Sequence, residues 1–155
     1  MNIDELREEI AQDEGVKKND SGQHIVYLDH LNLATVGIGH LVTEWDDEYG
    51  KPVGTPVTDE RVNELFAKDI ETTISECKEL FDNFDELPEE VKKICANMMF
   101  NMGRPRLSGF KKFRAAIANN DWQECAVQME DSRWHKQVTN RANRLISRMR
   151  AVEST

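Results

Sequence analysis

No stretch of this chain approaches the roughly 20 consecutive apolar residues that a membrane-spanning helix needs. The first residues are acidic and lack the apolar segment of a secretion signal. Proline and glycine are few, at 4 and 8 of 155 residues, and neither internal repeats nor low-complexity tracts occur. The sequence therefore predicts a soluble protein without a signal peptide, folded as a single domain of residues 1–155.

Cysteine is scarce and odd in number, with Cys77, Cys95 and Cys125 widely spaced at apolar positions. This pattern argues against a disulfide framework and predicts buried free thiols. The four histidines are scattered without the spacing of metal ligands, so we expect neither metal nor cofactor. We expect His40 to bond a carboxylate instead, with Asp69 as the candidate.

The net charge of −9 conceals an asymmetry between the two halves of the chain. Residues 1–90 hold 7 Lys and Arg against 24 Asp and Glu, a net −17; residues 91–155 hold 13 against 5, a net +8. Either the halves attract each other, or the basic half meets a polyanion such as bacterial wall or nucleic acid. The acidic half disfavours wrapping of a duplex, so we expect no nucleic acid partner. We also expect the protein to be a monomer.

Local patterns predict an α+β fold with its strands near the N-terminus. Asn2 is a candidate cap for a helix over 2–12, and Gly15 is suited to end it. Two short strands are expected at 24–28 and 34–38, joined by a turn at 29–32 and followed by an irregular connection over 44–57.

Helical periodicity begins at Thr58 and predicts one long helix over 58–81. Further helices are expected from Pro88 to Gly103, from Ser108 to Ala118, after Asp121, and from Thr139. The predicted organisation is a small antiparallel sheet lobe at about 13–57, a linking helix at about 58–81, and a helical lobe at about 82–155 that includes helix 2–12.

Glu14, Asp29 and Thr35 form the pattern with the most chemical content. Two carboxylates and a hydroxyl on short rigid elements are sufficient to hydrolyse a glycosidic bond. Glu14 lies at the negative end of its predicted helix, which disfavours its charged form and suits a general acid. On position alone, an ordinary surface glutamate beside a glycine cap is the better interpretation.

Five segments, in order, carry a family resemblance: Asp13-Glu14-Gly15, Tyr27-x-Asp29, Thr35-x-Gly-Ile-Gly-His-Leu41, Asn97-Met-x-Phe100-x-Met-Gly103, and Ser132-Arg-Trp with Asn140-Arg141-Ala. The chain resembles the phage-type lysozymes, the muramidases of T-even phages and their relatives, in glycoside hydrolase family 24. The resemblance implies a lysozyme-like fold and hydrolysis of the β-1,4 bond between N-acetylmuramic acid and N-acetylglucosamine in peptidoglycan.

The resemblance also implies catalytic roles. Glu14 matches the general acid, Asp29 the carboxylate that activates or orients water, and Thr35 the hydroxyl that helps to hold this water. The family is generally considered inverting, which implies carboxylates about 6.5–9.5 Å apart. Asp20 is a competing second carboxylate, but it lacks the Tyr-x-Asp context, so Asp29 is preferred.

Substrate-binding positions follow from the same resemblance. Leu41 and Phe100 match positions on either side of a cleft, and Arg141 matches a cation near the acid. Phe113 and Gln128 stand where the helical lobe of relatives usually offers small polar cleft residues.

Two other functional classes remain open at this point. One is a wall-binding module of a phage tail or wall-recognition protein with little turnover. The other is a structural helical domain that self-associates through its charge asymmetry. As a phage endolysin, the protein would be made in the host cytoplasm and would act at the bacterial wall.

Overall fold

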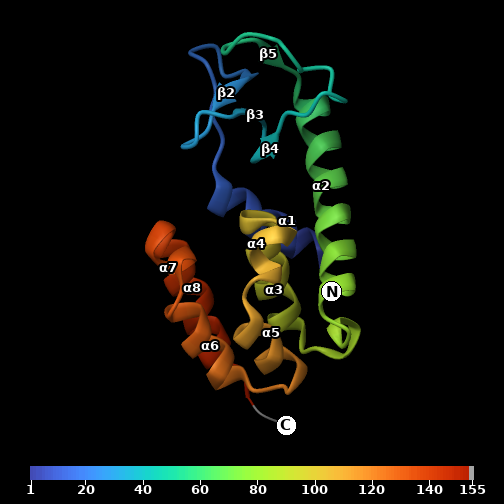
Figure 1. Cartoon of the computed structure of the whole chain (residues 1–155). Coiled ribbons are helices and arrows are strands. Elements are labelled where there is room, and N and C mark those ends of the chain that lie inside the picture. The colour runs from blue at the N-terminus through green and yellow to red at the C-terminus, as the bar shows by residue number, and fades with distance from the viewer. Residues whose placement is uncertain (154–155) are drawn as a thin grey trace. The chain divides into compact units, whose positions relative to one another are not determined.

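The computed structural model describes residues 1–153 and contains two compact units (Figure 1). The sheet unit is Arg7–Glu71, and the helical unit comprises Met1–Leu6 and the chain from Thr72 onward. Strands are confined to the first and helices dominate the second, so the predicted α+β class is confirmed. Within the described residues, no helix is long and apolar enough to cross a membrane.

Helix α1 (Ile3–Glu14) lies between the expected cap Asn2 and the expected stop Gly15, and it extends two residues beyond the predicted range 2–12. At its start, the backbone N–H of Glu5 donates to the side-chain oxygen of Asn2 at 3.1 Å. At its end, Gly15 adopts a φ of 70° and its N–H bonds the carbonyl of Ala11 at 3.0 Å. This left-handed glycine stops the helix and leaves Glu14 as its last residue.

Two small antiparallel sheets form the centre of the sheet unit. Strands β2 (Tyr27–Leu28), β3 (Ala34–Val36) and β4 (His40–Leu41) make one, in that order. Strands β1 (His24–Ile25) and β5 (Pro56–Val57) make the other.

The prediction of a single strand at 24–28 is therefore wrong, because the structure has two strands there. The prediction of an irregular connection over 44–57 is also wrong at its end, because β5 lies there. The division falls at Val26, whose N–H donates to the carbonyl of Thr55 at 2.9 Å. Because Val26 bonds the segment before β5, the chain leaves one sheet there and enters the other. The strand is interrupted because Val26 pairs with Thr55, which is distant in the sequence, and a local sequence pattern does not indicate such a pairing.

Helix α2 (Asp59–Leu80) matches the long helix expected at 58–81 within one residue at each end. Its residues Val62 and Leu65 pack with Val26, Val36 and Val57 to form the apolar core beneath the sheets. Gly37 passes close to this helix, since an added Cβ would lie 2.9 Å from Cγ1 of Val62. The core thus fixes the turn between β3 and β4 against α2.

The helical unit contains seven further helical segments: η1 (Phe84–Glu86), α3 (Glu89–Met102), α4 (Arg104–Ser108), α5 (Lys111–Ala118), α6 (Trp122–Glu130), α7 (Arg133–Gln137) and α8 (Thr139–Arg150). Helices α5 and α8 both pack on α6. The helix expected from Ser108 is wrong at its start, because Ser108 ends α4 and α5 begins at Lys111. The five-residue helices α4 and α7 are too short to produce a periodic pattern.

The cysteines lie where the sequence predicts them. All three are buried free thiols in the core. Burial raises the pKa of Cys77 and of Cys125 to about 12, so these thiols stay protonated and unreactive at neutral pH.

Candidate active site

Glu14 is half-buried at the end of α1, and its carboxyl group lies against the turn between β3 and β4. A Cβ added to Gly39 would lie 3.0 Å from Oε2 and 3.1 Å from Cδ of Glu14. Gly39 also has a φ of 67°, which side chains rarely adopt. Only glycine at this position lets the backbone of the turn approach the carboxyl group so closely.

Asp29 is held by the loop that follows β2. Its Oδ1 accepts hydrogen bonds from the backbone N–H groups of Leu31 at 2.8 Å and Leu33 at 2.9 Å. Its own backbone closes the turn, because the N–H of Asn32 donates to its carbonyl at 2.9 Å and Asn32 has a φ of 61°. The loop therefore fixes the orientation of the carboxylate before any ligand binds.

Thr35 lies at the centre of the three-stranded sheet with only 3% of its surface exposed. It stands opposite Tyr27 on one side and Leu41 on the other. Its hydroxyl donates to the carbonyl of Leu33 at 2.9 Å. Because a hydroxyl has one hydrogen, Oγ1 can only accept from a further partner such as water.

Tyr27 connects the two predicted carboxylates electrostatically. Its pKa is raised, first by burial and then by the negative charges of Glu14 and Asp29, while hydrogen bonding from the backbone of Gly39 opposes the rise. Both carboxylates therefore lie close enough to act on one phenol, within one unit of the molecule. In the sequence, Tyr27 was noted only as part of the Tyr-x-Asp motif and was given no role.

Asp20 lies elsewhere, exposed in a turn of its own. The segment after α1 folds back where Asn19 bonds Gln23 backbone to backbone at 2.9 Å. The side chain of Asn19 accepts from the N–H groups of Ser21 and Gln23, each at 3.0 Å. Residues 19–23 thus form a turn of their own ahead of β1.

His40 bonds Asp69 as expected, with Nδ1 at 2.7 Å from Oδ2. A second carboxylate was not expected: Nε2 lies 2.8 Å from Oδ2 of Asp46. Burial acts to lower the pKa of His40, but the hydrogen bonds and charges of the two aspartates outweigh it and raise the pKa. The imidazolium form is therefore favoured, and it joins the segment after β4 to helix α2.

Arg61 makes a second connection between the same two segments. Its guanidinium donates to both carboxylate oxygens of Glu48, at 3.0 and 3.1 Å. This pairing lowers the pKa of Glu48, which is only 6% exposed. Together, the two ionic connections hold residues 43–50 against α2.

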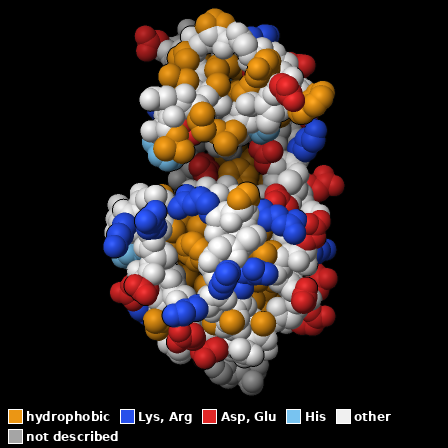
Figure 2. All heavy atoms as spheres, in the orientation of Figure 1, with side chains coloured by type: hydrophobic (Ala, Val, Ile, Leu, Met, Phe, Trp, Pro, Cys, Tyr) orange, Lys and Arg blue, Asp and Glu red, His pale blue; other side chains and the backbone are white. Residues whose placement is uncertain are grey.

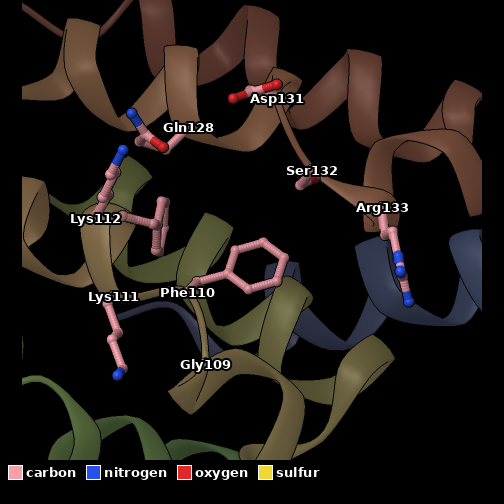
Figure 3. Close-up of a pocket in the computed structure, with 9 residues that line it drawn as sticks. Gly109, Phe110, Lys111, Lys112, Gln128, Asp131, Ser132 and Arg133 are labelled. Atoms are coloured by element: carbon pink, nitrogen blue, oxygen red, sulfur yellow. The ribbon is translucent and has the colours of Figure 1, made fainter.

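The helical unit has a pocket of about 380 Å³ that brings together two of the predicted binding residues, Phe113 and Gln128 (Figure 3). Phe113 is 1% exposed, and its ring meets that of Phe110 edge to face at 6.5 Å between centroids. Phe113 therefore forms a buried wall of the pocket rather than an exposed contact. Lys111, Lys112 and Arg133 also line it, which makes the pocket basic.

The remaining predicted binding residues are placed as follows. Arg141 is buried on α8, where its Nε donates to the side-chain oxygen of Asn97 on α3 at 2.8 Å. Phe100 is half-buried on α3. Leu41, in the sheet unit, is 49% exposed beside Thr35.

The surface differs between the units. On the face drawn in Figure 2, Lys and Arg side chains gather over the helical unit and apolar ones over the sheet unit. Exposed large apolar side chains of the sheet unit include Leu31 at 65% and Trp45 at 87% exposure. The helical unit is thus the more cationic surface.

Comparison with known proteins gives a consistent result. Residues 17–153 match the model of the phage lysozyme family. Two proteins of Dictyostelium discoideum, described as probable T4-type lysozyme 2 and 1, are 29% and 27% identical, over 94% of this chain and 93% of each relative. The peptidoglycan hydrolase gp36 of Pseudomonas phage phiKMV is 27% identical over 74% of this chain and 12% of its own length.

Proposed function

Because the chain belongs to the phage lysozyme family, and is thus a glycoside hydrolase that acts as a muramidase on peptidoglycan, we propose that Glu14, Asp29 and Thr35 perform the cleavage. The supporting observation is that the carboxyl group of Glu14 lies against Gly39 in the turn after β3, while Asp29 and Thr35 are joined at the start of β3 through their bonds to Leu33. A wall-binding module with little turnover is not favoured by the family membership.

In the proposed reaction, protonated Glu14 gives its proton to the oxygen that links N-acetylmuramic acid to N-acetylglucosamine. As the bond from this oxygen to the anomeric carbon breaks, positive charge develops on the sugar that retains the carbon. A water molecule then adds to this carbon. Glu14 has lost its proton at this stage. A proton must therefore return to Glu14 before the next cycle.

Asp29 and Thr35 are suited to hold that water. Oδ1 of Asp29 already accepts two backbone hydrogen bonds, which leaves Oδ2 to accept a hydrogen of the water. Thr35 has donated its hydrogen to Leu33 and can only accept, so it takes the other hydrogen of the water. The lone pair of the water is then directed at the anomeric carbon, and its proton passes to Asp29.

We propose that the reaction inverts the anomeric configuration. A carboxylate that activates water from the face opposite the acid produces inversion, whereas a carboxylate nucleophile produces retention. The two backbone hydrogen bonds to Oδ1 of Asp29 support the first role, because they hold the carboxylate with Oδ2 left to accept a hydrogen of the water.

Substrate-binding residues are proposed in each unit separately. In the sheet unit, Leu41 would pack against a sugar ring beside Thr35. In the helical unit, the proposed substrate-binding residues are Phe100, Arg141, Phe113 and Gln128. We also propose that the enzyme works as a monomer and that nucleic acid is not a partner, since the acidic half of the chain opposes a phosphate backbone.

Replacement of the general acid tests the proposal. Glu14→Gln removes the transferable proton while preserving size, so we expect loss of wall lysis by at least about a hundredfold, as for general acid catalysis. Clearing of purified wall suspensions and release of reducing ends measure it, with circular dichroism as the check on folding. The control is Glu44→Gln, an exposed glutamate of the same unit. Lysis at the wild-type rate by Glu14→Gln would refute the assignment.

The second carboxylate is tested by a matched pair of variants. We expect Asp29→Ala to lose most activity and Asp20→Ala to lose little, because Asp29 is held by Leu33 beside Thr35, whereas Asp20 is exposed in a separate turn. The reverse ranking would assign the role to Asp20. Proton magnetic resonance of the first product formed from soluble glycan should show the α-anomer, whereas initial β-anomer would exclude inversion.

A further inference from the structure

Tyr27 lies among the proposed catalytic groups without a role in the reaction just described. Tyr27 begins β2, and Asp29 follows it by two residues in the loop after that strand. Thr35 stands directly opposite it on β3. The phenol is half-buried, and the ammonium of Lys17 lies 5.3 Å from the centroid of its ring. The ring is therefore held from both the sheet and the solvent side.

The hydroxyl of Tyr27 contacts the turn that lies against Glu14. It donates a long hydrogen bond of 3.4 Å to the carbonyl of Gly37. This turn is confined on both sides, because Gly37 approaches Val62 of α2 and Gly39 approaches the carboxyl group of Glu14. The phenol oxygen thus bonds the first residue of a three-residue turn whose last residue lies against Glu14.

We propose that Tyr27 is a positioning residue for the reaction: its hydroxyl restrains the Gly37–Gly39 turn, and the backbone of that turn holds the carboxyl group of Glu14 in the orientation that reaches the glycosidic oxygen. The inference rests on the proposed role of Glu14. Tyr27 itself transfers no proton and forms no bond to the substrate.

The electrostatic surroundings suit this role. Burial and the two nearby carboxylates raise the pKa of Tyr27, so the phenol is protonated at neutral pH. It therefore remains a donor to Gly37 throughout the cycle. A phenolate at this position would instead add a third negative charge beside Glu14 and Asp29.

The change Tyr27→Phe tests the proposal because it removes only the oxygen. We expect kcat on soluble peptidoglycan oligomers to fall about tenfold, the effect of one lost hydrogen bond on a transition state, while KM stays within about twofold. Tyr49→Phe is the matched control, since Tyr49 is 63% exposed in the same unit, and it should leave both parameters unchanged.

A double-mutant cycle separates positioning from mere structural support. If Tyr27 acts through the turn, the effects of Tyr27→Phe and Gly39→Ala on kcat are not additive, because each displaces the same carboxyl group. Additive effects would overturn the proposal, as would a Tyr27→Phe enzyme with wild-type kcat or with a raised KM alone. These results concern Tyr27 only, whereas wild-type activity of Glu14→Gln would refute the proposed function itself.

Discussion

Gly39 is the position at which one added methyl group would reach the proposed general acid. We expect Gly39→Ala to reduce kcat about tenfold or more, because its Cβ would displace the carboxyl group of Glu14 from 3.0 Å away. Its positive φ adds a stability cost of about 1 kcal/mol, as for any left-handed alanine. Initial rates on soluble oligomers and urea denaturation measure the two effects.

Gly22→Ala is the control for backbone strain. Gly22 has a φ of 78°, but a Cβ there would meet nothing within 4 Å. It should lose a similar stability and keep its activity. Equal loss of activity in both variants would attribute the effect of Gly39 to strain and not to contact with Glu14.

The residues of the site also show how far sequence reasoning reaches. The family resemblance marked Glu14, Asp29 and Thr35, whereas position alone favoured an ordinary surface role for Glu14. Sequence reasoning missed Asp46 as a partner of His40, since nothing local distinguishes one of the four acidic residues of 44–48 from another. Only the path of this loop over α2 selects the carboxylate that meets the imidazole.

At the scale of elements, the ionic connections of residues 43–50 to α2 are the feature with a pH dependence. The raised pKa of His40 means that its contribution to stability is complete below the ordinary value of about 6.5 and is lost as the pH rises through the raised value. The lowered pKa of Asp46 means that its contribution is present above about 3.9 and is lost as the pH falls through the lowered value. The ion pair of His40 and Asp46 therefore contributes most to the free energy of unfolding between about pH 4 and 6.5.

We expect His40→Asn to destabilise the protein by about 2 kcal/mol at pH 5.5, the value of charge-assisted hydrogen bonds, and by clearly less at pH 9. Urea denaturation at the two pH values measures this. His30→Asn is the control, because His30 is exposed on a loop of the same unit, and it should match the wild type at both. A destabilisation by His40→Asn that is equal at both pH values would contradict the ionic account.

Element boundaries were predicted where the signal is local. Asn2 and Gly15 delimit α1 as expected, and the N-cap of α6 is confirmed by the bond from the N–H of Glu124 to Asp121 at 3.1 Å. Strands β4 and β5 and helices α4 and α7 were missed. A two-residue strand exists only through its partner, and a five-residue helix spans little more than one turn, so neither carries a pattern of its own.

At the scale of the whole molecule, the uneven charge of the chain has a testable consequence. The proposed wall substrate carries carboxylates, and Lys111 and Lys112 are exposed at the basic pocket. We expect Lys111→Gln with Lys112→Gln to raise KM about threefold at low salt, since exposed ion pairs contribute a few tenths of a kcal/mol each. The difference from wild type should shrink as added NaCl screens these charges.

Lys51→Gln with Lys68→Gln provides the control at equal net charge, because both lysines are exposed in the acidic half of the chain. This variant should keep the wild-type KM. Should both double variants raise KM alike, net charge and not the pocket would govern wall binding.

The sequence by itself determined the α+β class, the long helix α2, the family and the residue types of the site. These depend on periodicity, capping and spacing, which act over a few residues and can be recognised in the sequence without a structure. The tertiary structure alone decided the separation of the two sheets at Val26, the second carboxylate on His40, and the approach of Gly39 to Glu14. Each of these is a contact between segments distant in the chain, which packing against the core selects and which no local pattern encodes.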